Sequence, residues 1–283
     1  MKILITGSNG QVGSSLVNCL KKYELIPLTR DDCDLNLLDQ IKKTIDQNLP
    51  DLIINSAAYT DVDQAEIDTK LAYNINRDAP KVLAQKANEY NIPFIHFSTD
   101  YVFDGKKEGS YSEDDATNPL GAYGQSKLAG EEMIMEVGGQ CYIFRTSWVY
   151  SNRGNNFYLT MKRLSLYRDE LKVVADQVGV PSSNTFIAKQ IKKIIPQLSE
   201  NNIGIYNLVP DGFCTWYEFA KEIISKTNPD FDLDNLRSIQ THDYPTKVKR
   251  PQNSCLNNTK AKKTFMLESS SWKTELNRVI DDA

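Results

Sequence analysis

Residues 2–13 read KILITGSNGQVG, and this stretch decides the fold class. A short apolar run is followed by three glycines at a spacing of three residues. Gly7 permits a tight turn after a strand, Gly10 lets a phosphate approach the backbone, and Gly13 lets the next helix pack closely. Because such a turn presents the N–H groups of a helix N-terminus, the stretch predicts a site for the pyrophosphate of a dinucleotide.

The rest of the chain alternates short apolar runs with longer amphipathic ones. Seven runs are typical of buried strands, at residues 2–6, 24–29, 51–57, 92–99, 141–148, 171–175 and 204–209. Helical spacing of apolar residues lies between the first of them, at 11–23, 37–48, 79–90 and 126–137. This alternation predicts an α/β fold, a Rossmann-type doubly wound parallel sheet built from βαβ units.

The pattern loosens after Trp148. Helical segments at 152–164, 185–198 and 215–224 are separated by longer loops. We therefore expect a dinucleotide-binding domain over residues 1–148 that also receives later segments. A smaller, partly interleaved C-terminal region over 149–283 is expected to bind the substrate.

Composition narrows the class of protein. Hydrophobic residues make up 40% of the 283 and charged residues 25%, which is typical of a soluble globular protein. The net charge is −4, and the lysines and arginines are scattered rather than gathered in a basic stripe, so neither nucleic acid nor a membrane surface is an expected partner. Five cysteines without C-x-x-C spacing and only two histidines predict neither a disulfide framework nor a metal site. With no signal-like or membrane-length apolar segment, we expect a cytoplasmic protein.

Charged residues follow the second predicted strand. Arg30 follows this strand directly, and Asp31, Asp32 and Asp34 come next. A carboxylate at this place binds the adenosine ribose hydroxyls of NAD, whereas an arginine pairs with the extra phosphate of NADP. Both residue types are present, so these residues leave the choice of cofactor open.

A tyrosine and a lysine on one helix face form the candidate catalytic pair. Tyr123 and Lys127 stand at i and i+4, and the loop TNPLG at 117–121 would start their helix at the sheet edge. An ammonium near a phenol favours the phenolate, which would lower the pKa of Tyr123 toward the range of proton transfer. Thr99 ends a predicted strand and offers a hydroxyl to the same substrate oxygen. His96, alternating with apolar neighbours on that strand, is expected to be an interior histidine rather than a catalyst.

Together with GSNGQVG, several further motifs resemble one family: NSAAYTDVD (55–63), STDYVFDG (98–105), NPLGAYGQSKLAGE (118–131), FRTSWVY (144–150), DQVGVPS (176–182) and RPQNS (250–254). This is the extended short-chain dehydrogenase/reductase family, and within it the branch that reduces dTDP-4-dehydrorhamnose. The resemblance covers nearly the whole chain. It implies NADPH-dependent reduction, with NADH also accepted, of the C4 keto group of dTDP-4-dehydro-6-deoxy-L-mannose to dTDP-L-rhamnose.

The resemblance also implies roles for individual residues. Thr99, Tyr123 and Lys127 would be the catalytic triad, with Tyr123 as general acid. The implied cofactor residues are Gly7, Gly10, Gln11, Val12 and Gly13 at the pyrophosphate, Arg30, Asp34 and Leu35 at the adenosine, Ala57, Ala58, Tyr59 and Thr60 along the cleft, and Tyr123 and Lys127 at the nicotinamide end. The implied substrate residues are Thr99, Asp100, Tyr123, Trp148 and Arg250.

Two positions depart from related patterns. Sugar-nucleotide dehydratases have an Asp-Glu pair where this chain has Asp100 and Tyr101, so simple reduction is favoured. Some family members form a magnesium-bridged dimer through a glutamate after the third glycine, where this chain has Ser14 and Ser15. A monomer or a homodimer therefore both stay open. The alternative functions are another reductase or epimerase of sugar nucleotides, and a non-catalytic subunit like the regulatory subunit of methionine adenosyltransferase.

Overall fold

The computed structural model describes residues 1–282, and its centre is a six-stranded parallel sheet. The strand order is β10-β5-β4-β3-β1-β2. The strands are β1 (Lys2–Thr6), β2 (Glu24–Leu28), β3 (Leu52–Asn55), β4 (Phe94–Thr99), β5 (Cys141–Thr146) and β10 (Gly204–Asn207). All five neighbouring pairs run parallel, which confirms the predicted fold class.

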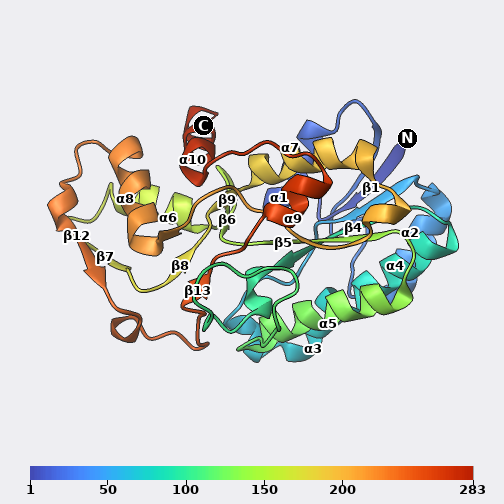
Figure 1. Cartoon of the computed structure of the whole chain (residues 1–283), viewed down its shortest axis with the longest axis horizontal. Helices are drawn as coiled ribbons and strands as arrows, with labels where there is room; N and C mark the ends of the chain where they lie inside the picture. The colour runs from blue at the N-terminus through green and yellow to red at the C-terminus, as the bar shows by residue number, and fades with distance from the viewer. Residues whose placement is uncertain (283) are drawn as a thin grey trace.

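Helices cover both faces of this sheet (Figure 1). One face carries α1 (Gln11–Cys19), α7 (Asn184–Ile194) and α9 (Thr259–Thr264), and the other carries α2 (Leu38–Asn48), α4 (Ala79–Glu89) and α5 (Ala122–Val137). Alternate strand residues point to the two faces, so Ile3 and Ile5 join one core cluster and Leu4 joins the other. Double coverage explains why these strands are apolar at consecutive positions.

The strand order changes direction at β1. Strand β2 lies on one side of β1, whereas β3, β4 and β5 follow on the other. Open α/β sheets bind ligands outside the carboxyl ends of the strands at such a switch point. The segments that leave β1, β3 and β4 therefore form the edge where a site is expected. Short elements lie along these segments: η1 (Gln64–Glu66), α3 (Thr69–Tyr73), η2 (Asn74–Asp78) and η3 (Asp100–Val102).

A second body packs beside the sheet, on the left of Figure 1. Its helices are α6 (Phe157–Leu164), α8 (Trp216–Thr227) and α10 (Trp272–Asp281), around a separate apolar core. Its strands are short: β6 (Val149–Tyr150), β7 (Leu171–Val174), β8 (Val178–Gly179), β9 (Ser182–Ser183), β11 (Cys214–Thr215), β12 (Leu236–Ile239) and β13 (Asn253–Ser254). Its remaining turns are η6 (Leu233–Asn235) and η7 (Thr241–Asp243), whereas η4 (Ile195–Gln197) and η5 (Glu200–Asn202) follow α7 on the first body, where Ile195 joins the core of the main sheet.

The predicted strand at 171–175 forms, but outside the main sheet. Strand β7 pairs only with β12, in a two-stranded sheet. Leu171 and Val173 are buried whereas Lys172 is exposed, a period of two that suits a strand covered on one face only. The expectation that residues 171–175 form a strand is confirmed, but this strand is covered on one face only, unlike the strands of the main sheet.

Later segments return to the first body. Strand β10 is the edge strand of the main sheet, and α7 packs against α1. The division at residue 148 stays a prediction, but the sheet takes in residues beyond it. No helix within residues 1–282 has the length and apolar character needed to span a membrane. The five cysteines are all unpaired.

Candidate active site

The glycine turn lies at the switch point, and close packing forbids side chains in it. Gly7 has φ +65°, and a Cβ there would lie 2.8 Å from the Cα of Ala57. A Cβ on Gly13 would lie 2.1 Å from the carbonyl oxygen of Gly7. No side chain caps the start of α1, and no acidic residue stands in its first turn. These unengaged N–H groups suit a phosphate, so the chain's own residues fit a dinucleotide here.

Gln11 begins α1 and connects it to the second body. Its Oε1 accepts hydrogen bonds from Ser151 Oγ at 2.9 Å and Asn156 Nδ2 at 2.8 Å. Its carbonyl oxygen accepts from Asn184 Nδ2 at 3.1 Å. The side-chain oxygen of Gln11 therefore ties residues 151–156 to the glycine turn. Val12, the next residue, packs against the core.

The residues after β2 divide between the surface and the core. Arg30 is 71% exposed, and its Nε lies 3.5 Å from Asp34 Oδ2. The carboxylate of Asp32 points back to Thr29, whose backbone N–H and hydroxyl both donate hydrogen bonds to it. These bonds lower the pKa of Asp32. Leu35 is buried among core residues rather than open toward the cleft. A hollow opens beside this turn, lined by Asn36, Ile67, Asp68, Lys70, Leu71 and Asn74.

The segment after β3 is fixed by a buried asparagine that sequence reasoning missed. Asn76, fully buried in η2, accepts from the N–H of Tyr59 at 2.9 Å and donates to its carbonyl at 3.0 Å. Asn76 also donates to Ser126 on α5 at 3.0 Å. Ala57 and Ala58 are half-buried and Thr60 is exposed. The predicted cleft residues are thus tied to the helix that carries Tyr123.

Strand β4 ends in the polar cluster expected from the sequence. Thr99 Oγ1 donates to Asp100 Oδ1 at 3.2 Å and accepts from the N–H of Tyr101 at 3.2 Å. Asp100 is buried, its Oδ2 has no partner among the described residues, and burial raises its pKa to about 6. A partly protonated carboxyl therefore stands beside the Thr99 hydroxyl near neutral pH.

Tyr123 lies in the first turn of α5 and faces this cluster. Its ring meets Tyr101 edge to face, with centroids 5.6 Å apart. Burial raises the pKa of Tyr123 well above its usual value, and a hydrogen bond with Thr99 opposes that rise only in part. This direction is the opposite of the lowering expected from a neighbouring ammonium. Thr99 and Tyr123 are nevertheless brought together, as the sequence predicts.

Lys127 is buried one turn further along α5. Its Nζ donates to the carbonyl oxygen of Phe97 at 2.6 Å and lies 3.1 Å from His96 Nε2. Burial lowers the pKa of Lys127 to about 8, although the carboxylate of Glu131 opposes the shift. His96 is buried, as expected, but it directly contacts a proposed catalytic residue.

Glu66 fixes the start of α5. Gly121 has no side chain to cap the helix, and Glu66 Oε1 accepts from the N–H of Ala122 at 2.6 Å. A Cβ on Gly121 would lie 2.7 Å from the same carboxylate oxygen. A carboxylate at a helix N-terminus is favourable because the N–H groups there carry partial positive charge. Local spacing does not reveal this contact, because Glu66 and Ala122 are 56 positions apart in the chain.

Two further predicted residues lie where the second body meets the sheet. Trp148 has φ +46° and stacks on Trp216, with centroids 3.5 Å apart and planes 9° from parallel. The side chain of Arg250 is 19% exposed, and its Nη2 donates to Asp63 Oδ2 at 2.6 Å. Arg250 also interacts with the hydroxyl of Tyr101, whose pKa burial raises to about 12.

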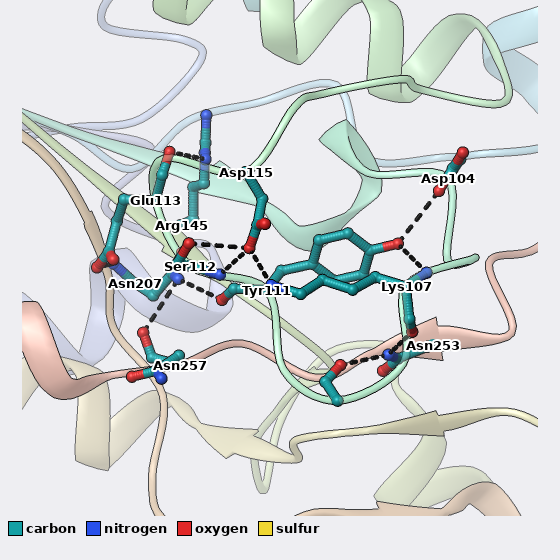
Figure 2. Close-up of polar contacts among 11 residues, drawn as sticks. Asp104, Lys107, Tyr111, Ser112, Glu113, Asp115, Arg145, Asn207, Asn253 and Asn257 are labelled. Atoms are coloured by element: carbon teal, nitrogen blue, oxygen red, sulfur yellow. Dashed lines mark hydrogen bonds and ion pairs between the residues drawn. The ribbon is translucent and has the colours of Figure 1, made fainter.

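The loop between β4 and α5 is fastened by Tyr111 (Figure 2). The hydroxyl of Tyr111 donates to Asp104 at 3.1 Å and accepts from the N–H of Lys107 at 3.0 Å. Asn207, at the end of β10, donates to the carbonyl of Tyr111 at 2.9 Å. Asn253 donates to the carbonyls of Lys107 and Gly109 at 2.7 and 2.6 Å. These hydrogen bonds hold the loop after β4 against β10 and β13.

The sheet, the uncapped glycine turn and the Thr–Tyr–Lys set at its carboxyl edge define an extended short-chain dehydrogenase/reductase. Comparison with known proteins narrows this class. The family model described as RmlD substrate binding domain matches residues 1–283. The chain belongs to the dTDP-4-dehydrorhamnose reductase family, as its similarity to curated members and solved structures also shows.

The relatives match along their full length. A dTDP-4-dehydrorhamnose reductase of Aggregatibacter actinomycetemcomitans is 40% identical over 98% of each chain. That of Escherichia coli K12 is 38% identical, over 100% of this chain and 98% of its own. The crystal structure of a dTDP-4-dehydrorhamnose reductase from Clostridium acetobutylicum superposes with a TM-score of 0.93, at 40% identity over 99% of both chains. The Bacillus anthracis dTDP-4-dehydrorhamnose reductase, solved in complex with NADP, gives 0.94 at 34% identity, over 100% of this chain and 99% of its own.

Proposed function

We propose that this chain reduces the C4 keto group of dTDP-4-dehydro-6-deoxy-L-mannose to give dTDP-L-rhamnose. The convergence of Thr99 and Tyr123 at the sheet edge that also carries the glycine turn supports the proposal, since it brings a proton donor to the same edge as a dinucleotide site. Full-length relatives named for this reaction support the substrate class. The working cofactor is NADPH, in line with the NADP complex of a relative, and NADH is accepted as well.

The cofactor residues follow the geometry of the switch point. Bound NADPH would supply the hydride. The backbone of the glycine turn at 7–13 would hold the pyrophosphate, and Arg30 is exposed enough to reach a 2′-phosphate. Asp34 orients Arg30, while the half-buried segment at 57–59 lines the cleft. The side chain of Leu35 is buried in the core next to this cleft and would support it without contacting the cofactor.

Tyr123 is the proposed general acid. A phenol with a raised pKa stays protonated, and in reduction it gives its proton to the oxygen that becomes the new hydroxyl. Thr99 hydrogen-bonds the same oxygen and orients it. Lys127, one turn further along the same helix, would bind the ribose next to the nicotinamide.

Tyr101 distinguishes reduction from dehydration. A dehydratase needs a carboxylate to remove the proton beside the keto group, and a tyrosine with a pKa near 12 cannot serve as that base. Asp100 accepts a hydrogen bond from Thr99 instead, and we propose that it shapes the substrate end of the cleft. Trp148 and Arg250 would contact the sugar nucleotide from the second body. The reaction is placed in the cytoplasm, where NADPH is available, with the chain acting as a monomer or homodimer.

The test is a panel of dTDP- and UDP-linked 4-keto sugars with NADPH or NADH, followed at the nicotinamide absorbance. The expected result is one NADPH consumed per dTDP-4-keto sugar, with a product two hydrogen atoms heavier. Interconversion of sugars without net NADPH consumption would identify an epimerase instead. No turnover with any keto sugar, in a protein that binds NADPH, would favour the non-catalytic subunit.

A further inference from the structure

Trp148 has an unusual backbone conformation at the sheet edge that carries the candidate site. Thr146, the last residue of β5, pairs with Thr99 of β4, so Trp148 follows the partner of Thr99 by two positions. Its φ of +46° lies in the left-handed region, which is unfavourable for a residue with a bulky side chain. Such a conformation persists only where the surrounding structure fixes it, and it is concentrated at functional sites.

Hydrogen bonds to one short segment fix the backbone around Trp148. The carbonyl oxygen of Trp148 accepts from the N–H of Ser182 at 3.2 Å, and the hydroxyl of Ser147 donates to the carbonyl of Val180 at 2.8 Å. Strand β6, which follows Trp148, then pairs in parallel with β9. The segment 180–182 therefore holds the chain in the turn that Trp148 makes.

Gly179, the last residue of β8, lies against one face of the Trp148 indole. A Cβ on Gly179 would lie 2.4 Å from Cε2, 2.6 Å from Cζ2 and 2.7 Å from Nε1 of Trp148. Because Cε2 is bonded to both of the other atoms, a point at nearly equal distances from all three lies above the ring plane rather than at its edge. The backbone of Gly179 is not left-handed, so the indole is what leaves no room for a side chain.

Trp216 covers the other face of this indole. The two ring centroids lie 3.5 Å apart and the planes are 9° from parallel. Since this separation is close to the contact distance of two carbon atoms, the rings overlap with little lateral offset. Gly179 cannot share a face that is already covered, so the Trp148 indole is held between Gly179 and Trp216. These three residues form an indole clamp, and Phe157 packs behind Trp216 with centroids 4.5 Å apart.

Regular secondary structure sets the width of the indole clamp. In the antiparallel pair of β8 and β11, Gly179 lies opposite Cys214, and Trp216 begins α8 directly after β11. Thr215 caps that helix, since its hydroxyl accepts from the N–H of Glu218 at 3.1 Å. The carboxylate of Glu218 accepts in return from the N–H of Thr215 at 2.8 Å. A strand pair and a capped helix therefore keep the two sides of the clamp in place.

With both faces covered, only the edge of the Trp148 indole can contact a ligand, and Trp148 is partly exposed. We propose that Gly179 and Trp216 are positioning residues that present this indole edge-on to the sugar nucleotide. The sugar nucleotide then meets the ring edge with its N–H donor rather than stacking on the ring face. This role rests on the proposed function, whereas the clamp itself follows from the geometry.

The first test measures the contact between Gly179 and Trp148 by thermal unfolding, without substrate. Gly179→Ala should lower Tm, because the new methyl group displaces the indole. In a Trp148→Leu protein, whose side chain ends short of the three ring atoms, the same substitution should have little effect on Tm. Equal losses of Tm in both backgrounds would overturn the clamp.

The second test follows the indole N–H signals of the three tryptophans by ¹H–¹⁵N NMR. Each signal is assigned by its loss in Trp148→Leu, Trp216→Leu or Trp272→Phe. Stacked rings shift each other's signals through their ring currents, so Trp216→Leu should move the Trp148 signal, and Trp216→Phe, which keeps an aromatic face, should move it less. A Trp148 signal that stays in place in Trp216→Leu would contradict the stack.

The third test measures steady-state kinetics and separates positioning from stability. Gly179→Ala and Trp216→Leu should each raise KM for the keto-sugar nucleotide by about tenfold, with kcat within about twofold. Kd for NADPH should stay unchanged, which shows that the first body is folded. Trp216→Phe should keep most of the original KM.

The outcomes of the three tests distinguish this inference from the proposed function. An unchanged KM in Gly179→Ala or in Trp216→Leu would refute the positioning role. The expected Tm and NMR results, in a protein without any reductase activity, would refute the proposed function and leave the indole clamp standing.

Discussion

Tyr123 is the proposed general acid, and its partly buried ring packs against Tyr101. Replacing it with phenylalanine removes one oxygen and keeps the ring that packs on Tyr101. We expect kcat for reduction to fall by about 10²–10⁴, the usual contribution of a positioned general acid, with Kd for NADPH unchanged. Stopped assays of the purified variant, with fluorescence titration of NADPH, measure both. Turnover close to that of the unmutated protein would exclude Tyr123 as the acid.

Asp100 makes stability depend on pH. Its pKa rises from 3.8 to about 6 on folding, so its contribution is fully present below pH 3.8 and is lost as pH rises through 6. A shift of about two units corresponds to roughly 3 kcal/mol. We expect the unfolding free energy of Asp100→Asn, relative to the unmutated protein, to rise by up to that amount between pH ~4 and ~8. Urea denaturation at both pH values measures it, and a constant difference would contradict the raised pKa.

Arg30 tests the choice of cofactor. It is exposed and held by Asp34, and a charge-assisted bond to a 2′-phosphate contributes about 1.5–3 kcal/mol. We expect Arg30→Ala to lower the ratio of kcat/KM for NADPH over NADH by roughly tenfold or more. Asp34→Asn, which frees the guanidinium, is the matched control and should not lower it. An unchanged ratio in Arg30→Ala would make Arg30 an ordinary surface charge.

At the scale of elements, α5 depends on a carboxylate supplied from outside the helix. Glu66→Ala leaves the N–H of Ala122 without its partner, and loss of such a cap costs about 1 kcal/mol. Glu66→Gln still offers an oxygen. We expect Glu66→Ala to lower both Tm and kcat, since the capped turn also holds Tyr123, and Glu66→Gln to retain most of both. Thermal melts with steady-state kinetics decide this, and equal kcat in both variants would show that the cap does not position Tyr123.

Elements that depend on local pattern were predictable from the sequence. The glycine turn, the strands that precede Thr6 and Thr99, and the helix with Tyr123 all follow from spacing over a few residues. The partner of β7 was not predictable, because β12 lies more than sixty residues away and no local signal selects it. The same holds for the Glu66 cap on α5 and for the hydrogen bonds of Asn76 to Tyr59 and Ser126. These polar partners are far apart in the sequence, and only the folded chain brings them together.

At the scale of the whole molecule, Arg250 joins the second body to the sheet edge through Asp63. A substrate phosphate would compete with that carboxylate for the guanidinium. We expect Arg250→Gln to raise KM for the sugar nucleotide about tenfold or more, with Kd for NADPH unchanged. Asp63→Asn removes the competitor and keeps the cation, so its KM should stay equal or fall. Equal rises in both variants would mean that the ion pair only fastens the two bodies.

The sequence named most of the candidate site but not its assembly. Thr99, Tyr123 and Arg250 come from three distant stretches, and only the folded chain shows that Tyr101 lies against both Tyr123 and Arg250. Leu35 shows the converse limit: its position in the chain matches a cofactor residue, yet its side chain belongs to the core. A motif fixes where the backbone passes, whereas burial of each side chain depends on neighbours that the motif does not contain.

The return of β10 and α7 to the first body also determines how the protein can be made. A ribosome releases residues 1–148 before the strand that completes the sheet edge and the helix that covers α1. Until about residue 207 has emerged, β5 keeps an unpaired edge and one sheet face keeps its apolar side chains in water. Such surfaces associate with other chains during synthesis. We therefore expect a gene fragment ending at Trp148 to aggregate rather than fold into a nucleotide-binding half.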